Sequence, residues 1–239
     1  ELGLAQGLSL QVHHHPELGK KLPQTTALVK SVLDELGIPW EELIPCGIVG
    51  VIGKPEGKRI LLRADMDALP MQETTGLPFA SQHPGCMHAC GHDGHMSIAL
   101  ALAESLKDAA PERNVLLIFE PAEETTGGAR HICESGILER FHVTRVYGLH
   151  LWPELPKGVV ASRAGGMMAR SCELTVEIGG KPVHIAHFSE GCDALLAGVR
   201  FLEKSYRLAE GKPCLLRFGR MESGSARNAV SGSTRLEGT

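Results

Sequence analysis

The sequence lacks several features that would place it in a specialised class of proteins. No apolar run is long enough to span a bilayer. The 24 lysines and arginines nearly balance the 28 aspartates and glutamates, and the net charge of −4 gives no reason to expect nucleic acid or an anionic membrane as a partner. Internal repeats and low-complexity tracts are also absent. With 43% hydrophobic and 22% charged residues, the composition is typical of a soluble globular protein.

The chain also lacks the regular cysteine pattern of a disulfide framework. Its seven cysteines are odd in number and are scattered through apolar segments. Such a set favours free thiols, and we therefore expect a protein of the reducing cytoplasm.

Apolar spacing predicts an α/β domain in the first two thirds of the chain. Helical spacing occurs in residues 24–36, 95–110 and 128–134. Strand-like runs occur in residues 47–53, 58–64, 114–119 and 145–149. The last two runs are nearly continuous and apolar, as expected of strands buried on both faces. The alternation of strands and helices indicates a layered domain, and the long irregular stretch between residues 65 and 91 favours a functional loop.

The pattern changes near residue 170. Residues 173–178 alternate between polar and apolar, which predicts a half-exposed antiparallel strand. An amphipathic helix over residues 193–208 and strands over residues 214–220 and 233–237 follow. This β-α-β-β order predicts a second, smaller domain that is incomplete, because it stops at a strand whose edge needs a covering partner. We therefore divide the chain into residues 1–169 and residues 170–239.

Three short clusters carry donor groups for a metal ion. Residues 88–93 read His-Ala-Cys-Gly-His-Asp, residues 121–124 read Pro-Ala-Glu-Glu, and residues 148–150 read Gly-Leu-His. Thiolate, imidazole and carboxylate groups hold transition-metal ions, and one carboxylate is left over to activate water. Two of the clusters follow predicted strands, and ligand sites gather at strand ends in α/β sheets. Together the clusters predict a metal site.

Each cluster also has a structural interpretation when it is taken alone. We expect Cys90 and His92 to reach one metal from extended backbone, where residues two apart share a face, because a helix would separate them by roughly 200°. They would equally suit a buried cysteine beside a surface histidine. Glu123 and Glu124 should diverge, one toward a metal and one toward water or substrate, but adjacent acids also suit a solvated helix start. A lone His150 would more often be structural.

Further stretches extend the pattern to a known family. They are residues 15–18, 62–70, 73–78, 87–95 and 228–239. In order and spacing the chain resembles the metal-dependent amidohydrolases of the aminoacylase and zinc-carboxypeptidase superfamily. Within it, the chain is most similar to the branch of hippurate hydrolase, auxin-conjugate hydrolases and N-acetyldiaminopimelate deacetylase. The resemblance implies a zinc-peptidase-like mixed sheet with flanking helices and an inserted α+β lid of the ferredoxin-like kind, here truncated.

The resemblance implies a two-metal site in the first domain. Cys90, His92, Glu124 and His150 would be four of its five protein ligands, with Cys90 as a bridging thiolate. These ligands admit two divalent ions of zinc, manganese, cobalt or nickel. Glu123 would be the general base, taking a proton from water and passing it to the leaving amine.

The resemblance also implies supporting residues and a dimer. In the lid, His184 would stabilise the oxyanion, Asn228 would contact substrate, and Arg227 would hold a substrate carboxylate. Asp67 and Asp93 would orient the ligand imidazoles. The lid mediates dimerisation in relatives, so a homodimer is expected.

The chain departs from the family pattern in four respects. Residues 185–188 read Ile-Ala-His-Phe where many members have Met-Pro-His, so His187 is not carried over as a site residue. Glu120 stands where members usually have glutamine, which adds a negative charge near the site. Pro182 and Val183 replace the small residues that usually precede the lid histidine. The fifth ligand, a histidine, and an acidic Glu-Asp-Phe segment are not found before Thr239, so we expect an incomplete metal site in the chain as given.

These features leave three hypotheses for function. The first is an enzyme that hydrolyses the amide of an N-acyl amino acid (acetyl, benzoyl or similar) to a carboxylate and a free amine. The alternative is a non-catalytic dimerisation or binding module, an inactive or fragmentary relative. A third hypothesis, one structural zinc ion, leaves the paired glutamates and His150 unexplained; its ligands would be His88, Cys90, His92 and His95.

Overall fold

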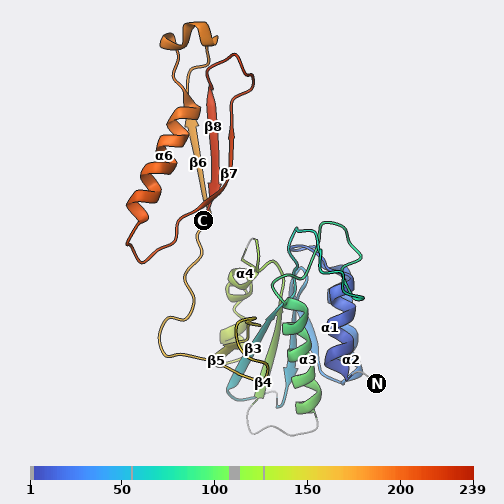
Figure 1. The fold of residues 1–239 in the computed structure, drawn as a ribbon. Coiled ribbons are helices and arrows are strands. Elements are labelled where there is room, and N and C mark those ends of the chain that lie inside the picture. Colours follow the sequence, from blue (N-terminus) through green and yellow to red (C-terminus); the bar gives the residue numbers. More distant parts are fainter. Residues whose placement is uncertain (1–2, 55, 108–113, 126) are drawn as a thin grey trace. The chain divides into compact units, whose positions relative to one another are not determined.

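The structure is a computed structural model that describes residues 3–54, 56–107, 114–125 and 127–239 (Figure 1). The chain divides into two compact units, Glu1–Gly158 and Val159–Thr239. Among the described residues, none of the helices combines the length and the apolar character needed to cross a membrane.

Over the described residues, the first unit contains a five-stranded mixed sheet in the order β1-β2-β4-β3-β5. Its strands are β1 (Trp40–Ile44), β2 (Gly47–Ile52), β3 (Arg59–Asp65), β4 (Asn114–Glu120) and β5 (Val143–Gly148). β4 and β5 run parallel to β3, whereas β2 is antiparallel to both β1 and β4. Because parallel strands end at the same edge of a sheet, the residues that follow β3, β4 and β5 meet there.

Helices cover both faces of this sheet (Figure 1). They are α1 (Leu4–His14), α2 (Pro23–Glu35), α3 (His92–Lys107), α4 (Gly128–Glu134) and α5 (Ile137–Arg140). In β4, Val115, Leu117 and Phe119 pack with α1, α2 and α3, whereas Leu116 and Ile118 pack with α4 and α5. Successive side chains of a strand point to opposite faces, and burying one such side chain contributes about 1.5–3 kcal/mol. The predicted burial of residues 114–119 on both faces is therefore confirmed.

The start of α3 differs from the prediction. The predicted helices at residues 24–36 and 128–134 are confirmed as α2 and α4, but α3 begins at His92 rather than at residue 95. Gly91 has a φ of 83°, which a residue with a side chain rarely adopts. The prediction of extended backbone from Cys90 to His92 is therefore wrong, because the chain turns at Gly91 and enters the helix. Residues 108–110 of the predicted helix lie outside the described residues.

β5 is present where a strand was predicted, but it is not buried. Val146 is 60% exposed and Tyr147 is 48% exposed. β5 pairs with β3 on one side, and no described strand pairs with its other edge. The nearly continuous apolar run over residues 145–149 predicted a strand buried on both faces. This prediction is wrong, because the order of the strands places β5 at an edge of the described sheet.

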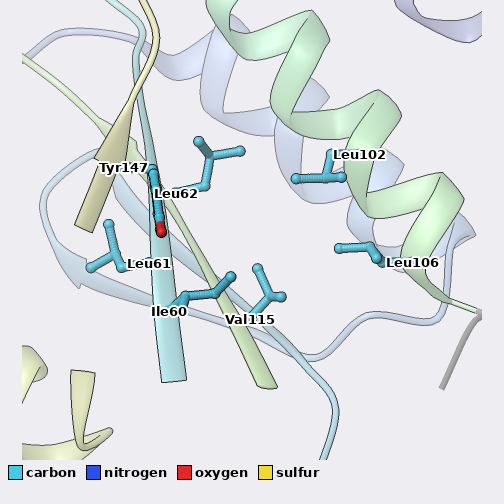
Figure 2. Close-up of a pocket in the computed structure, with 7 residues that line it drawn as sticks. All are labelled: Ile60, Leu61, Leu62, Leu102, Leu106, Val115 and Tyr147. Atoms are coloured by element: carbon cyan, nitrogen blue, oxygen red, sulfur yellow. The ribbon is translucent and has the colours of Figure 1, made fainter. Parts of the chain in front are cut away.

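An apolar groove of about 420 Å³ lies between the sheet and the C-terminal half of α3 (Figure 2). Leu102 and Leu106 of α3 face Ile60 and Leu62 of β3 across it, with Tyr147 of β5 beside them (Figure 2). None of the residues that line this groove is a predicted site residue.

The second unit contains an antiparallel sheet in the order β6-β8-β7, packed against one long helix. Its elements are β6 (Leu174–Gly179), the 3-10 helix η1 (Ile185–Glu190), α6 (Ala194–Ala209), β7 (Phe218–Ser223) and β8 (Ser233–Gly238). Asp193 caps α6 by accepting from the backbone N–H groups of Leu195 and Leu196. The predicted β-α-β-β order is confirmed. The predicted start of the second strand of this unit at residue 214 is wrong, because Leu215 is exposed and β7 begins at Phe218.

Candidate metal centre

The predicted metal ligands come together at the edge of the sheet where the parallel strands end. Cys90, His92 and Glu124 each offer a ligand atom, and these atoms lie within 4.8 Å of one another. The Sγ atom of Cys90 also lies 3.4 Å from Nε2 of His150. The four residues come from the turn before α3, the first residue of α3, the segment after β4 and the segment after β5. Open-sheet proteins bind ligands at this edge.

Two of these ligands carry buried polar atoms without hydrogen-bond partners. The side chain of His92 is 1% exposed, and both of its ring nitrogens lack a hydrogen-bond partner among the described residues. Oε1 of Glu124 is likewise a buried atom without a hydrogen-bond partner among the described residues, and it lies 3.6 Å from His92 Nε2. Burying such atoms unpaired is costly, and a cation between them would satisfy both. The donors present therefore fit a transition-metal ion.

The hydrogen bond made by His150 leaves its outer nitrogen available to a metal. Nδ1 lies 2.7 Å from the carbonyl oxygen of Leu151. A carbonyl oxygen can only accept, so Nδ1 carries the proton and Nε2 presents a lone pair toward Cys90. Such a hydrogen bond on the far nitrogen is the usual support of a metal-bound imidazole.

The surroundings of Cys90 favour the protonated thiol over the thiolate. Burial, and then the neighbouring carboxylate of Glu124, raise the pKa of Cys90 to about 12. Since the thiolate is the form that binds metal, a cation entering the site displaces this proton.

Glu123 lies beside the ligand cluster without joining it. Its Oε2 atom is 3.9 Å from His92 Nε2, and its side chain is 39% exposed. Burial, and then the charge of Glu124, raise the pKa of Glu123 above its usual value. A higher pKa makes this carboxylate a better acceptor for a proton from water. Glu123 is the more exposed of the two glutamates, but an oxygen of each lies near His92 Nε2, so the divergence of their side chains stays a prediction.

Asp67 holds the backbone of both glutamates. Its Oδ1 accepts from the N–H of Glu123 at 2.9 Å, and its Oδ2 accepts from the N–H of Glu124 at 3.2 Å. Oδ1 also lies 3.8 Å from Nδ1 of His92. Burial raises the pKa of Asp67. Asp67 therefore orients the segment that carries Glu123 and Glu124 as well as facing His92.

Asp93 has a different neighbour from the one expected. Its Oδ2 lies 2.9 Å from Nδ1 of His13 and 3.4 Å from the hydroxyl of Ser9, both on α1. No hydrogen bond joins Asp93 to His92 or His150 in the described part of the chain. Asp93 occupies the second position of α3, which packs against α1, and it connects these two helices.

Sequence reasoning missed a buried network beneath the ligands. Asp65, the last residue of β3, lies 2.6 Å from Nδ1 of His95 and 2.6 Å from Nη1 of Arg63. Burial alone would raise the pKa of Asp65, but the hydrogen bond from His95 and the charge of Arg63 outweigh it and lower the pKa. The same guanidinium meets Glu120 at 2.5 Å, so the negative charge expected at Glu120 is paired. Asp65 could have been found from the sequence, because it stands at the end of a predicted strand, as the glutamates that were predicted do.

The hypothesis of one structural zinc ion does not fit this network. His95 uses both ring nitrogens, Nδ1 toward Asp65 and Nε2 toward the N–H of Leu151 at 2.9 Å. It therefore has no lone pair left for a metal, although Asp65, His92 and His95 also have ligand atoms within 4.8 Å of one another. Among the described residues, neither candidate group of metal ligands includes His88.

The predicted lid residues belong to the second unit. The backbone of His184 forms a bridge with Ala229, and the N–H of Ile185 donates to the carbonyl of Asn228 at 2.9 Å. His184 and Asn228 therefore lie on neighbouring segments, with both side chains exposed. Arg227 is exposed as well.

Comparisons with known proteins agree with this arrangement. The model described as Peptidase family M20/M25/M40 matches residues 61–225. An N-acetyldiaminopimelate deacetylase of Lactobacillus acidophilus is 35% identical over 240 residues, which cover 95% of this chain and 63% of the relative. IAA-amino acid hydrolase ILR1-like 4 of Arabidopsis thaliana is 36% identical over 241 residues, which cover 98% of this chain and 54% of the relative.

A solved structure shows the same likeness. The YXEP protein of Bacillus subtilis, described as a dinuclear metal-binding peptidase from the M20 family, is 29% identical with a TM-score of 0.73. The match covers 98% of this chain and 62% of that protein. The chain therefore spans less than two thirds of the length of each of these three relatives.

Proposed function

Because the chain belongs to peptidase family M20/M25/M40, we propose that the protein hydrolyses the amide bond of an N-acyl amino acid with two divalent metal ions. One observation carries this proposal: the buried, unpartnered donor atoms of His92 and Glu124 converge with Cys90, and Cys90 contacts His150. The names of the relatives, a deacetylase of an N-acetylated amino acid and an amino acid hydrolase, support the substrate class.

Four side chains hold the metal ions in this proposal. Cys90 as a thiolate, His92, Glu124 and His150 supply thiolate, imidazole and carboxylate donors, a set suited to zinc, manganese, cobalt or nickel. When bound, such ions lower the pKa of water and polarise the amide carbonyl.

The proton steps belong to Glu123. Its carboxylate takes a proton from the attacking water and returns it to the nitrogen of the leaving amine. The raised pKa of Glu123 supports this role, because the carboxylate is then a stronger base near neutral pH. The hydrogen bonds that the backbone N–H groups of Glu123 and Glu124 donate to Asp67 support it further, since they fix the backbone that carries both glutamates.

Residues 170–239 act as the lid in this proposal, and residues 1–169 belong to the catalytic domain. His184 stabilises the oxyanion, Asn228 contacts the substrate, and Arg227 holds a substrate carboxylate. The exposure of these three side chains and the adjacency of His184 and Asn228 support the assignment. Asp93 supports the site by tying α3 to His13.

We propose a homodimer formed through the lid, in the cytoplasm. The seven cysteines all lie among the described residues and all are free, which supports a reducing compartment.

Metal analysis and a hydrolysis assay test the proposal together. The purified protein is loaded with Zn²⁺ or Mn²⁺ and assayed on N-acetyl and N-benzoyl amino acids. Glu123→Ala should reduce kcat by about 10²–10⁴-fold while the metal content stays the same. Glu104→Ala, which removes an exposed glutamate of α3, is the matched control and should leave both quantities unchanged.

Two outcomes would contradict the proposal. A protein that binds no divalent metal would refute the metal centre. A protein that binds metal but hydrolyses no N-acyl amino acid, with or without Glu123, would favour the non-catalytic module instead.

A further inference from the structure

The backbone of Leu151 connects two imidazoles at the metal centre. Its N–H donates to Nε2 of His95 at 2.9 Å, and its carbonyl oxygen accepts from Nδ1 of His150 at 2.7 Å. The two rings lie against each other, with centroids 4.8 Å apart in an edge-on arrangement. One peptide segment therefore lies between the predicted ligand His150 and a histidine with no assigned role.

The partners of His95 determine which ring nitrogen carries its proton. Since a backbone N–H can only donate, Nε2 of His95 must accept, and its proton sits on Nδ1. Nδ1 donates to Asp65 at 2.6 Å, and Asp65 is held in turn by Arg63. The buried His95 is thus in one fixed orientation, supported from the end of β3.

The side chain of Leu151 lies close to two glycines, Gly91 before α3 and Gly94 in its first turn. A Cβ atom at Gly91 would lie 3.0 Å from Cδ1 of Leu151, and one at Gly94 would lie 2.7 Å from it. The absence of side chains at both positions lets Leu151 approach the first turn of α3. Leu151 is therefore held by its backbone at His95 and by its side chain at the glycines.

We propose that His95 is a positioning residue of the metal centre, holding His150 in place through the backbone of Leu151. This inference rests on the proposed metal centre. His150 follows the end of β5 in a segment without helix or strand structure, so its ring direction depends on local contacts. The bond to His95 fixes the backbone of Leu151 at its N–H, and the carbonyl of the same residue fixes the His150 tautomer with Nε2 toward Cys90.

Two substitutions of His95 separate its two hydrogen bonds. In His95→Asn, the shorter amide reaches the position of Nδ1 and keeps the bond to Asp65, but it leaves the N–H of Leu151 without an acceptor. In His95→Gln, the amide oxygen reaches the position of Nε2 and restores that acceptor. Both replacements are uncharged and polar, so they differ chiefly in which partner they reach.

Metal affinity is the readout, measured by Co²⁺ titration followed through the thiolate-to-cobalt charge-transfer band of Cys90. His95→Asn should weaken binding by about 10–100-fold, the usual effect of losing the support of a ligand. The Co²⁺ affinity of His95→Gln should stay within about twofold of that of the unsubstituted protein, because the N–H of Leu151 keeps an acceptor; a difference of that size is within the usual scatter of such comparisons. Equal loss in both variants, or loss in neither, would overturn the proposal.

A double-mutant cycle shows whether His95 acts through His150. In the His150→Ala background, His95→Asn should have no further effect on Co²⁺ affinity. A full additional loss there would refute the coupling. Failure of the unsubstituted protein to bind Co²⁺ would refute the proposed function and this inference together, whereas binding with the wrong variant pattern would refute the inference alone.

Hydrogen exchange decides the question should His95→Asn fail to fold. In the unsubstituted protein, the proposal requires the amide of Leu151 to exchange more slowly than the amide of Trp152, because the first is hydrogen-bonded to a buried imidazole. Equal exchange at the two amides would show that the bond to His95 does not hold the segment.

Discussion

The carboxylate of Asp67 lies 2.9 Å from the backbone nitrogen of Glu123 and accepts its N–H, although the two residues are 56 positions apart in the chain. The second oxygen accepts the next N–H, that of Glu124. The residue before them, Ala122, has a φ of 58°, a conformation that costs residues other than glycine about 1–3 kcal/mol. The hydrogen bonds to Asp67 offset this strain and hold the backbone of the two glutamates.

Replacing Asp67 with alanine should therefore affect both glutamates. We expect Asp67→Ala to weaken metal binding by about 10–100-fold, because Glu124 loses the support of its backbone. The same change should lower kcat, because Glu123 moves with it. Asp67→Asn keeps an oxygen that can accept one of the two N–H groups. Its metal affinity and kcat should therefore lie between those of the unsubstituted protein and those of Asp67→Ala. Metal titration and steady-state kinetics check this, and unchanged affinity in Asp67→Ala would contradict it.

The ion pair between the half-buried Arg63 and the buried Glu120 predicts how substitutions of the two residues change stability. Arg63→Met leaves the carboxylates of Glu120 and Asp65 without their cation and should lower the free energy of unfolding by about 3–5 kcal/mol. Glu120→Gln keeps an oxygen that can accept the N–H of Ala129 and should cost less. Urea denaturation measures both changes.

The double variant is the control for this pair. Arg63→Met combined with Glu120→Gln should be more stable than Arg63→Met alone, because one uncompensated buried charge has been removed. Simple addition of the two single losses would show that the charges are not coupled.

Gly128, the first residue of α4, should not tolerate a side chain. A Cβ atom there would lie 1.8 Å from the carbonyl oxygen of Pro121, which is backbone and has no free rotation to give way. Gly128→Ala should lower the free energy of unfolding by about 1–3 kcal/mol or more and weaken metal binding, because Pro121 leads into the glutamates. Gly7→Ala, in the exposed middle of α1 with open space around it, is the matched control and should stabilise by up to about 1 kcal/mol. Equal effects of the two changes would contradict this prediction.

His88 predicts a loss of stability in acid for the metal-free protein. Burial lowers its pKa from 6.5 to about 4, despite the nearby carboxylate of Asp93. Between these values the unfolded chain binds a proton that the folded chain does not. The neutral His88 therefore makes its full contribution to the free energy of unfolding above pH 6.5. This contribution, on the order of 3 kcal/mol, is lost as the pH falls from 6.5 toward 4.

Two variants test the assignment to His88 by urea denaturation over this pH range. His88→Leu should flatten the acid limb, because it carries no titratable group and neither ring nitrogen of His88 has a hydrogen-bond partner among the described residues. His187→Ala removes an exposed histidine of the second unit and should keep the acid limb of the unsubstituted protein. An unchanged limb in His88→Leu would assign the acid loss to other groups.

The parts of the fold that sequence reasoning predicted are those set by local patterns. The alternating burial in β4 follows from its apolar run, and α2 and α4 follow from apolar spacing and turn residues. The meeting of Glu124 and His150 with Cys90 and His92 follows from a general rule, since residues after parallel strands share one edge of the sheet. These predictions need no knowledge of which side chains touch.

The partners of the site residues were decided by the tertiary structure alone. Asp93 pairs with His13, 80 positions away, and His95 pairs with Asp65, 30 positions away. The exposure of β5 depends on strand order, which a strand's own residues do not encode. The sequence thus determined which donors would gather at the sheet edge, because periodicity and strand direction are local properties. Only the tertiary structure decided which side chains form hydrogen bonds with one another. Hydrogen bonds act over about 3 Å, and here they join residues that are far apart in the sequence.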